Sequence, residues 1–240
     1  MLCQIGTGEV VGAVHPFRLI DDQRLLETHS FCDGQFFIEN PGWLSGGSIA
    51  WLLKILRLRD VAELNDLAST VAPGADDVLF LPALTGAMAP EWNADIHACF
   101  FNLKTHHGAG HLARAVLEGT AFAMHDVQLR LLDMGIAVNS IRLAGGGASS
   151  RLWAQIRADV AQLPVQVCGA RDASPLGAAV LAAVTAGQLS SIRAAAPLLN
   201  READWISPDP SLRSTYRSCH RNYLALFQHL KTMASTPAHG

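Results

Sequence analysis

The sequence has little charge. Of its 240 residues only 16% are Asp, Glu, Lys or Arg, against about 25% in an average soluble domain. The 18 basic and 21 acidic residues give a net charge of −3, and no basic block occurs. Nucleic-acid binding requires a basic surface, so nucleic acid is excluded as a predicted partner. Half of the residues are apolar, which excludes extensive disorder and predicts a globular protein with a sizeable core.

Cysteine and long apolar runs are also scarce. The five cysteines are scattered without a CxxC pair, so neither a disulfide framework nor a zinc ribbon is predicted, and a reducing cytoplasm is the expected location. No apolar run approaches the roughly 20 residues of a membrane-spanning helix. The N-terminus has no basic region before its apolar residues, unlike a signal peptide. We therefore expect no membrane association.

Strands alternate with helices along the chain. Apolar runs predict strands at 2–5, 10–14, 78–81, 141–144 and 165–167, with 78–81 as an interior strand, one short strand near 99–103, and a loop-rich stretch up to residue 42. Periodicity and caps predict helices at 46–58, 60–68, 112–134, from Ser149 or Ser150 to before Pro164, 174–186 and from 212 onward. This alternation predicts an α/β fold.

Two glycine-rich turns are candidate anion sites. Gly6-Thr7-Gly8 lies between two predicted strands, and Gly145-Gly146-Gly147 lies between a strand and a helix. Glycine lets backbone N–H groups point at an anion without a Cβ in the way. Each turn also has a simpler interpretation: the first is compatible with an ordinary hairpin, and the second with close packing of helix on strand. Neither the GxGxxG nor the P-loop pattern is present.

Other candidate residues are weaker. His106, His107 and His111 lie close in sequence, and His107 and His111 share a helix face. We expect no cysteine or carboxylate nearby to complete a site, so exposed or capping histidines are predicted rather than a metal site. Trp92 is interpreted as a packing anchor rather than a stacking platform. No GxSxG motif indicates a hydrolase.

Six segments together carry a resemblance that none carries alone. They are Gly6-Thr7-Gly8-Glu9, Gly46-Gly47-Ser48-Ile49-Ala50-Trp51, 80–86 through Pro90-Glu91-Trp92, Arg114-Ala115-Val116-Leu117-Glu118-Gly119, Gly145-Gly146-Gly147-Ala148 with Trp153, and Leu176-Gly177-Ala178-Ala179. In this order they resemble the C-terminal half of the FGGY carbohydrate kinases, the family of xylulokinase and glycerol kinase.

The resemblance implies an actin-like, ribonuclease-H-like α/β domain that forms one wall of an ATP cleft. It implies a domain at 1–200, a connector and helix of the same domain at 201–234, and a frayed tail at 235–240. The implied nucleotide contacts are the turn of Gly6, Thr7 and Gly8 at the phosphates, Gly46 beside the nucleotide, Gly145, Gly146, Gly147 and Ala148 along the adenosine, and Arg151 where glycerol kinase has asparagine.

The implied reaction is phosphoryl transfer from ATP, with Mg²⁺, to a sugar or polyol hydroxyl, with xylulose as the default acceptor. Family members are about twice as long as this chain, and their first domain supplies an Asp-x-Gly-Thr loop, most sugar contacts and the catalytic aspartate. We therefore assign no catalytic residue here and expect a separate N-terminal kinase domain as partner. The alternative is a noncatalytic nucleotide-binding or association module. The low charge predicts an exposed apolar face and a homo-oligomer.

Overall fold

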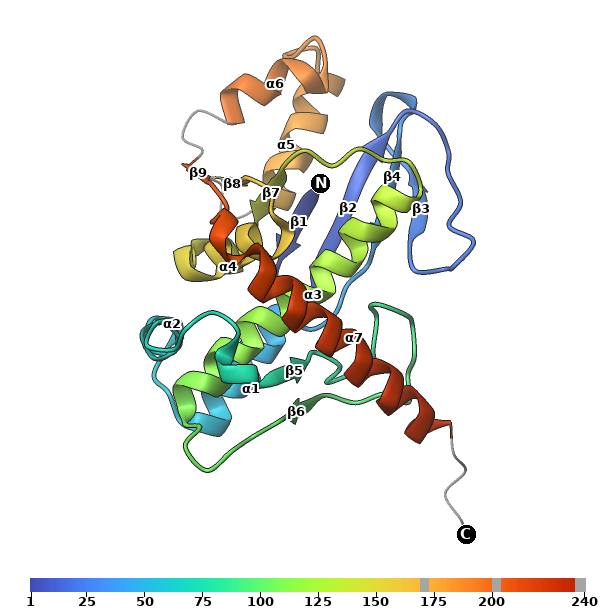
Figure 1. The fold of residues 1–240 in the computed structure, drawn as a ribbon. Helices are drawn as coiled ribbons and strands as arrows, with labels where there is room; N and C mark the ends of the chain where they lie inside the picture. The colour runs from blue at the N-terminus through green and yellow to red at the C-terminus, as the bar shows by residue number, and fades with distance from the viewer. Residues whose placement is uncertain (169–172, 200–203, 236–240) are drawn as a thin grey trace.

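The computed structural model describes residues 1–168, 173–199 and 204–235, and its main feature is a mixed seven-stranded sheet (Figure 1). The strand order is β3-β4-β2-β1-β7-β8-β9. The strands are β1 (Leu2–Ile5), β2 (Glu9–His15), β3 (Glu27–Ser30), β4 (Phe36–Asn40), β7 (Ile141–Ala144), β8 (Val165–Val167) and β9 (Asp204–Ile206). Strand β7 runs parallel to β1 and β8, and the other pairs are antiparallel. The predicted α/β class is confirmed.

A separate two-stranded sheet is formed by β5 (Leu79–Leu81) and β6 (Cys99–Phe101), which pair antiparallel. Both strands are predicted from the sequence, but the interior position expected for 78–81 is wrong. All three β5 residues are buried, yet β6 is the one strand described beside it. A helix covers β5 instead, and an apolar run does not distinguish burial by a helix from burial by strands.

Seven helices are described, and most begin and end where local signals place them. They are α1 (Ser45–Leu56), α2 (Val61–Ser69), α3 (Ala109–Asp133), α4 (Arg151–Ala161), α5 (Ala173–Thr185), α6 (Ile192–Leu199) and α7 (Arg213–Ala234). The Ser150 hydroxyl accepts from the Trp153 N–H at 3.2 Å, which identifies Ser150 as the cap of α4. Gly135, just after α3, has a φ of +79°, as a C-terminal cap requires.

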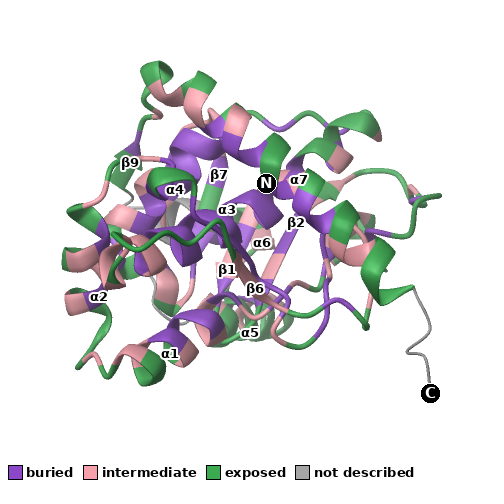
Figure 2. Cartoon of the chain, turned by 60° about the horizontal axis from the view of Figure 1, so that its bottom comes forward, coloured by how far each residue is buried: buried purple, intermediate pink, exposed green. Residues whose placement is uncertain are grey.

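Helix α3 runs through the middle of the molecule and is the most buried element (Figures 1 and 2). It packs against α1, α2, α4, α7 and β5. Three aromatic side chains of α7, those of Tyr216, Tyr223 and Phe227, enter the same hydrophobic core. The C-terminal helix is therefore part of the packing that holds α3 against the sheet.

Two stretches differ from their predicted local structure. The stretch predicted as loop before residue 42 contains β3 and β4, and the residues between α5 and α7, for which no helix or strand is predicted, contain α6 and β9. Strand β3 is polar and mostly exposed, so no apolar alternation marks it; its pairing with β4 makes it a strand. Residues 236–240 of the predicted tail lie outside the described residues, as do 201–203 of the predicted connector.

All five cysteines are free thiols. None of the helices in the described ranges is both long and apolar enough to cross a membrane.

Candidate functional site

A cleft of about 280 Å³ opens where three segments meet: the β1–β2 turn, the start of α1, and the turn between β7 and α4. Eleven residues line it: Ile5, Gly6, Thr7, Gly46, Ile49, Val61, Gly146, Gly147, Ser149, Ser150 and Trp153. The two glycine-rich turns therefore share one cleft although they lie far apart in the sequence.

The sheet explains why the two turns are neighbours. Strand β1 pairs with β7 in parallel, with Gln4 opposite Ala144. Each glycine turn follows the carboxyl end of its strand. The carboxyl ends of adjacent parallel strands lie at one edge of a sheet, where ligands bind in open α/β folds. The position of the cleft thus follows from the register of β1 and β7.

The turn of Gly6, Thr7 and Gly8 is an exposed hairpin turn held by two backbone bonds. The Gly6 N–H donates to the Gly8 carbonyl, and the Gly47 N–H donates to the Thr7 carbonyl, both at 2.8 Å. Among the described residues, no bond is formed by the Thr7 hydroxyl or by its N–H. The hairpin interpretation is thus correct, and the turn also presents two donors to the cleft.

The start of α1 packs closely on this hairpin. A Cβ at Gly46 would lie 2.2 Å from the Gly6 carbonyl oxygen, so a side chain there would push the two backbones apart. The residue before α1, Leu44, provides no side-chain cap. The Ser45 and Gly47 N–H groups donate to the Trp43 and Thr7 carbonyls. In the first turn of α1 the Gly46 N–H is therefore the donor without a bond among the described residues, at the positive end of the helix dipole beside the cleft.

The second turn combines both interpretations that the sequence leaves open. Gly145 has a φ of +87°, and a Cβ there would lie 2.4 Å from the Ile5 carbonyl oxygen, so this position is required for packing against β1. Around a Cβ at Gly146 no atom of a described residue lies within 4 Å, and Gly146 lines the cleft. Close packing on β1 thus explains why residue 145 is glycine, whereas Gly146 leaves open space in the cleft.

Five of the nine predicted site residues line the cleft: Gly6, Thr7, Gly46, Gly146 and Gly147. Gly8 completes the first turn without lining the cleft, and Gly145 and Ala148 support the second from behind, with Ala148 6% exposed. The Arg151 side chain is 78% exposed and lies 3.9 Å from the Asp204 carboxylate. Arg151 therefore points to solvent rather than into the cleft.

The apolar wall of the cleft contains residues that sequence reasoning did not assign to a site. Ile49 and Trp153 appear in the sequence as core positions of amphipathic helices, and Val61 carries no motif. The Trp153 indole N–H donates to the Leu117 carbonyl at 3.2 Å and to the Thr120 hydroxyl at 3.1 Å. These bonds fix the ring, so the cleft has one rigid apolar wall opposite its polar turns.

Among the residues that the structure describes, those lining the cleft include no carboxylate and no histidine. Their polar groups are backbone N–H groups and the hydroxyls of Thr7, Ser149 and Ser150. Such donors suit an anion, whereas a hard metal ion needs carboxylate or carbonyl oxygens. The cleft thus fits a ligand with an anionic part at the turns and a flat apolar part against Trp153.

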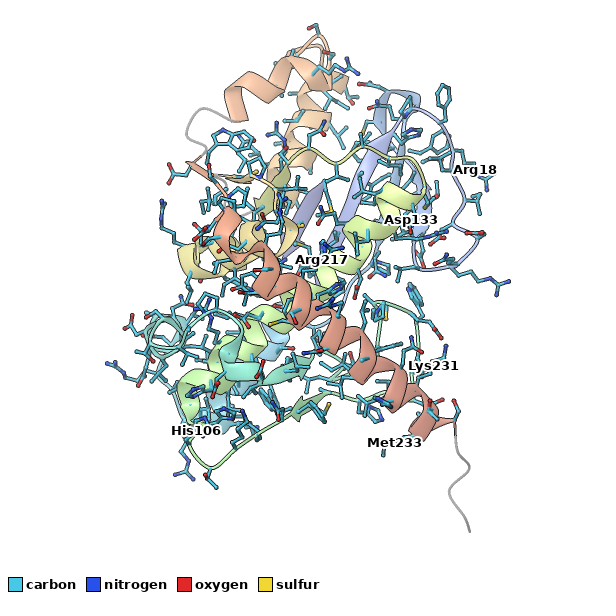
Figure 3. The ribbon with its side chains drawn as sticks, in the orientation of Figure 1. Arg18, His106, Asp133, Arg217, Lys231 and Met233 are labelled. Carbon is cyan, nitrogen blue, oxygen red and sulfur yellow. The ribbon has the colours of Figure 1, made fainter. Side chains whose placement is uncertain are left out.

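The histidines lie elsewhere, at the start of α3, where Figure 3 labels His106. One oxygen of Asp76 accepts from the Nε2 atoms of His106 at 2.7 Å and His107 at 2.9 Å. The expectation that no carboxylate stands nearby is therefore wrong, because Asp76 comes from a turn about 30 residues earlier in the chain. Hydrogen bonds from His106 and then His107 lower the pKa of Asp76 to about 2.

Asp76, His106 and His107 bring their ligand atoms within 4.8 Å of one another, close enough to hold a metal ion, but hydrogen bonds already engage these atoms. Backbone N–H groups donate to Nδ1 of His107 at 3.0 Å and of His111 at 3.2 Å. In the neutral rings the proton is therefore on Nε2, which leaves no lone pair there for a metal. His111 caps α3 through its bond from Gly108, as the sequence predicts.

A larger groove of about 980 Å³ lies between β6 and α7. Its lining includes Phe101, Leu230 and Met233, and Figure 3 labels Met233 near the end of α7. None of the predicted site residues lies in it. Trp92, also outside both hollows, donates its indole N–H to the Leu25 carbonyl at 3.2 Å, which supports its interpretation as an anchor.

Comparisons with known proteins find relatives over most of the chain. Residues 1–186 match the FGGY family of carbohydrate kinases, C-terminal domain. The xylulose kinase of Escherichia coli is 32% identical over 233 residues, which cover 95% of this chain and 48% of that protein. The gluconokinase of Bacillus subtilis is 36% identical over 207 residues, covering 81% of this chain and 40% of that protein.

Solved structures show the same fold. The xylulose kinase from Rhodospirillum rubrum superposes with a TM-score of 0.82 at 27% identity, covering 98% of this chain and 48% of that one. Plasmodium falciparum glycerol kinase with ADP gives a TM-score of 0.77 at 25% identity, covering 93% of this chain and 46% of that one. The chain spans about half the length of the curated relatives it matches.

Proposed function

Because this chain belongs to the FGGY family of carbohydrate kinases, as its C-terminal, actin-like domain, we propose that it is the ATP-side half of a carbohydrate kinase. The reaction would transfer the γ-phosphate of ATP to a sugar or polyol hydroxyl, with xylulose as the default acceptor. The observation that carries the proposal is the cleft in which the Thr7 turn, the start of α1 and the Gly146-Gly147 turn meet.

The cleft supports an ATP site in which this chain provides one wall. Ligand pockets that enclose a small molecule usually measure roughly 300–1,000 Å³, and this cleft measures about 280 Å³. The donors of Thr7 would bind phosphate oxygens, and Ile49 and Trp153 would border the apolar part of the nucleotide. Gly8, Gly145 and Ala148 would support the two turns. The Arg151 side chain would contact the nucleotide once its ion pair with Asp204 is broken.

Magnesium would be held mainly outside this chain. In the described ranges no carboxylate lines the cleft, so the donor set seen there fits the phosphates better than the ion. When bound, Mg²⁺ would offset phosphate charge during transfer. The catalytic base and the sugar contacts would belong to the expected N-terminal kinase domain, and we assign no catalytic residue to this chain.

Titration calorimetry of the folded chain with Mg-ADP and Mg-ATP tests the nucleotide site. We expect binding in the micromolar-to-millimolar range. In the Thr7→Val variant we expect binding about 10- to 100-fold weaker, because a hydrogen bond to a charged group contributes about 1.5–3 kcal/mol.

Thr232→Val is the matched control, since Thr232 is exposed on α7 and its hydroxyl donates to the Gln228 carbonyl at 3.0 Å. It should bind nucleotide like the parent chain. Equal weakening in both variants, or no binding at millimolar nucleotide by the folded parent, would contradict the proposed phosphate site.

The kinase assignment itself has a separate test in the DNA upstream of Met1. We expect an Asp-x-Gly-Thr domain, either in frame or in an adjacent gene. Its absence would favour the noncatalytic module instead. Phosphorylation of a pentulose or polyol by the purified chain would exclude that module.

Self-association and a cytoplasmic location remain predictions. Several large apolar side chains are exposed, including Phe17 at 70% and Met233 at 71%, and exposed apolar patches favour association. We expect light scattering to show a dimer or larger species for the isolated chain. A monodisperse monomer would show that these side chains do not drive association.

A further inference from the structure

An ion pair with no solvent exposure lies directly behind the Thr7 turn. Glu9 and Arg157 are both 0% exposed. The two guanidinium NH2 groups of Arg157 donate to the two carboxylate oxygens of Glu9, at 2.5 and 2.7 Å. This bidentate geometry is the strongest form of a charged pair in proteins. Glu9 is the first residue of β2, two positions after Thr7.

The pair connects three elements that border the cleft, namely β2, α1 and α4. Through Glu9 it holds the end of the Thr7 turn. Arg157 also donates to the Ser45 hydroxyl at 3.3 Å, and Ser45 begins α1. On α4, the Arg157 guanidinium lies 4.8 Å from the ring centre of Trp153, which lines the cleft. One buried side chain therefore contacts the turn, the helix start and the apolar wall.

Stability alone does not account for such a pair. Replacing a buried ion pair by apolar residues is often neutral or stabilising, because the desolvation of both charges offsets their attraction. Here the Arg157 Nε is also buried without a hydrogen-bond partner among the described residues, which adds a cost. The location of the pair, behind the donors that face an anion, suggests a role in the site.

We propose that Glu9 and Arg157 are positioning residues of the nucleotide site, an inference that rests on the proposed function. Arg157 holds the Thr7 turn, Ser45 and Trp153 in one arrangement. Its charge also neutralises Glu9, whose carboxylate would otherwise repel phosphate groups from the back of the turn.

The two charges predict opposite effects on binding. Arg157→Met leaves the Glu9 carboxylate buried and unneutralised, so we expect Mg-ADP to bind at least tenfold more weakly. Glu9→Gln keeps an oxygen for Arg157 but leaves its positive charge in excess, so binding should be unchanged or severalfold tighter. The double variant should fall between the two. A purely structural pair would weaken binding in both single variants.

Amide hydrogen exchange supplies a readout that needs no nucleotide. In Arg157→Met we expect at least tenfold faster exchange in residues 4–11, with α3 unchanged. Arg130→Met is the matched control: Arg130 is also largely buried, and its Nε donates to Asp21 at 2.8 Å, away from the cleft. It should leave both the turn and nucleotide affinity unchanged.

Arg157→Lys keeps the charge and loses the bidentate contact. It therefore tests the positioning role if the Arg157→Met variant does not fold. We expect its Mg-ADP affinity to lie between those of the parent and of Thr7→Val. The positioning role is overturned if the amide exchange rate of residues 4–11 rises no more in the Arg157 variants than in Arg130→Met. The parent chain could fail to bind Mg-ADP while Arg157 variants still show faster amide exchange in residues 4–11 alone. That result would reject the proposed function but keep the role of Arg157 in positioning the turn.

Discussion

Replacing Gly42 with alanine will prevent cooperative folding of the chain. Gly42 has a φ of +87°, and a Cβ there would lie 1.1 Å from the Glu9 carbonyl oxygen and 2.3 Å from its carbonyl carbon. Because both contacts are with backbone, no side-chain rotation relieves them. The Gly42 N–H also donates to Oδ1 of Asn40 at 2.8 Å, which holds the residue in place. Relief would require β2 to move at Glu9, and the Thr7 turn with it.

Gly34→Ala is the control for Gly42→Ala, because it introduces backbone strain without a clash. Gly34 has a φ of +70°, but no atom lies within 4 Å of a Cβ there. We expect Gly34→Ala to cost only about 1–2 kcal/mol, the penalty of a left-handed residue. Urea unfolding followed by tryptophan fluorescence measures both variants. Equal unfolding midpoints would mean that the Gly42–Glu9 approach is not tight in solution.

Arg114→Met will reduce the free energy of unfolding by about 3–5 kcal/mol, because it leaves a buried carboxylate without its charged partner. Arg114 Nε donates to Glu118 at 2.8 Å, and the two side chains are 7% and 2% exposed. The same Glu118 oxygen accepts from the Gly74 N–H at 2.9 Å and the Tyr216 hydroxyl at 3.1 Å. Arg114 also donates to the Val71 carbonyl at 3.0 Å. This network joins α3 to α7 and to the segment before β5.

The loss should depend on pH. Burial raises the pKa of Glu118, and the charge of Arg114 opposes that rise. Without Arg114 the native pKa rises further, so between the unfolded pKa of about 4.3 and the native pKa the native state binds more protons than the unfolded state. Stability then falls as pH increases through that window. Chemical denaturation should show a larger loss at pH 8 than at pH 5.

The double variant Arg114→Met with Glu118→Gln tests this cause. It has no ionisable group at position 118, so the additional loss between pH 5 and pH 8 should disappear. Persistence of that pH dependence in the double variant would show that another group is responsible.

Local signals predicted the elements that carry them. Asp60 and Ser150 cap α2 and α4 through their own side chains. The apolar period from Leu112 to Leu131 predicts α3, although the helix is buried on every side from Ala113 to Met124. Strands β3 and β9 lack such a signal, because only their partners β4 and β8 make them strands. The hydrophobic periodicity of a segment does not predict which distant segment it pairs with.

The candidate site shows the same difference between local signals and long-range contacts. The α/β class, both glycine turns and the family resemblance could be predicted from the amino-acid sequence, because turn chemistry and periodicity act over a few residues. Three features became visible in the folded chain alone: the turns share a cleft with Ile49 and Trp153, Arg151 faces solvent, and Arg157 pairs with Glu9. These facts depend on the parallel register of β1 and β7 and on the packing of α1 and α4, which bring residues remote in the chain into contact.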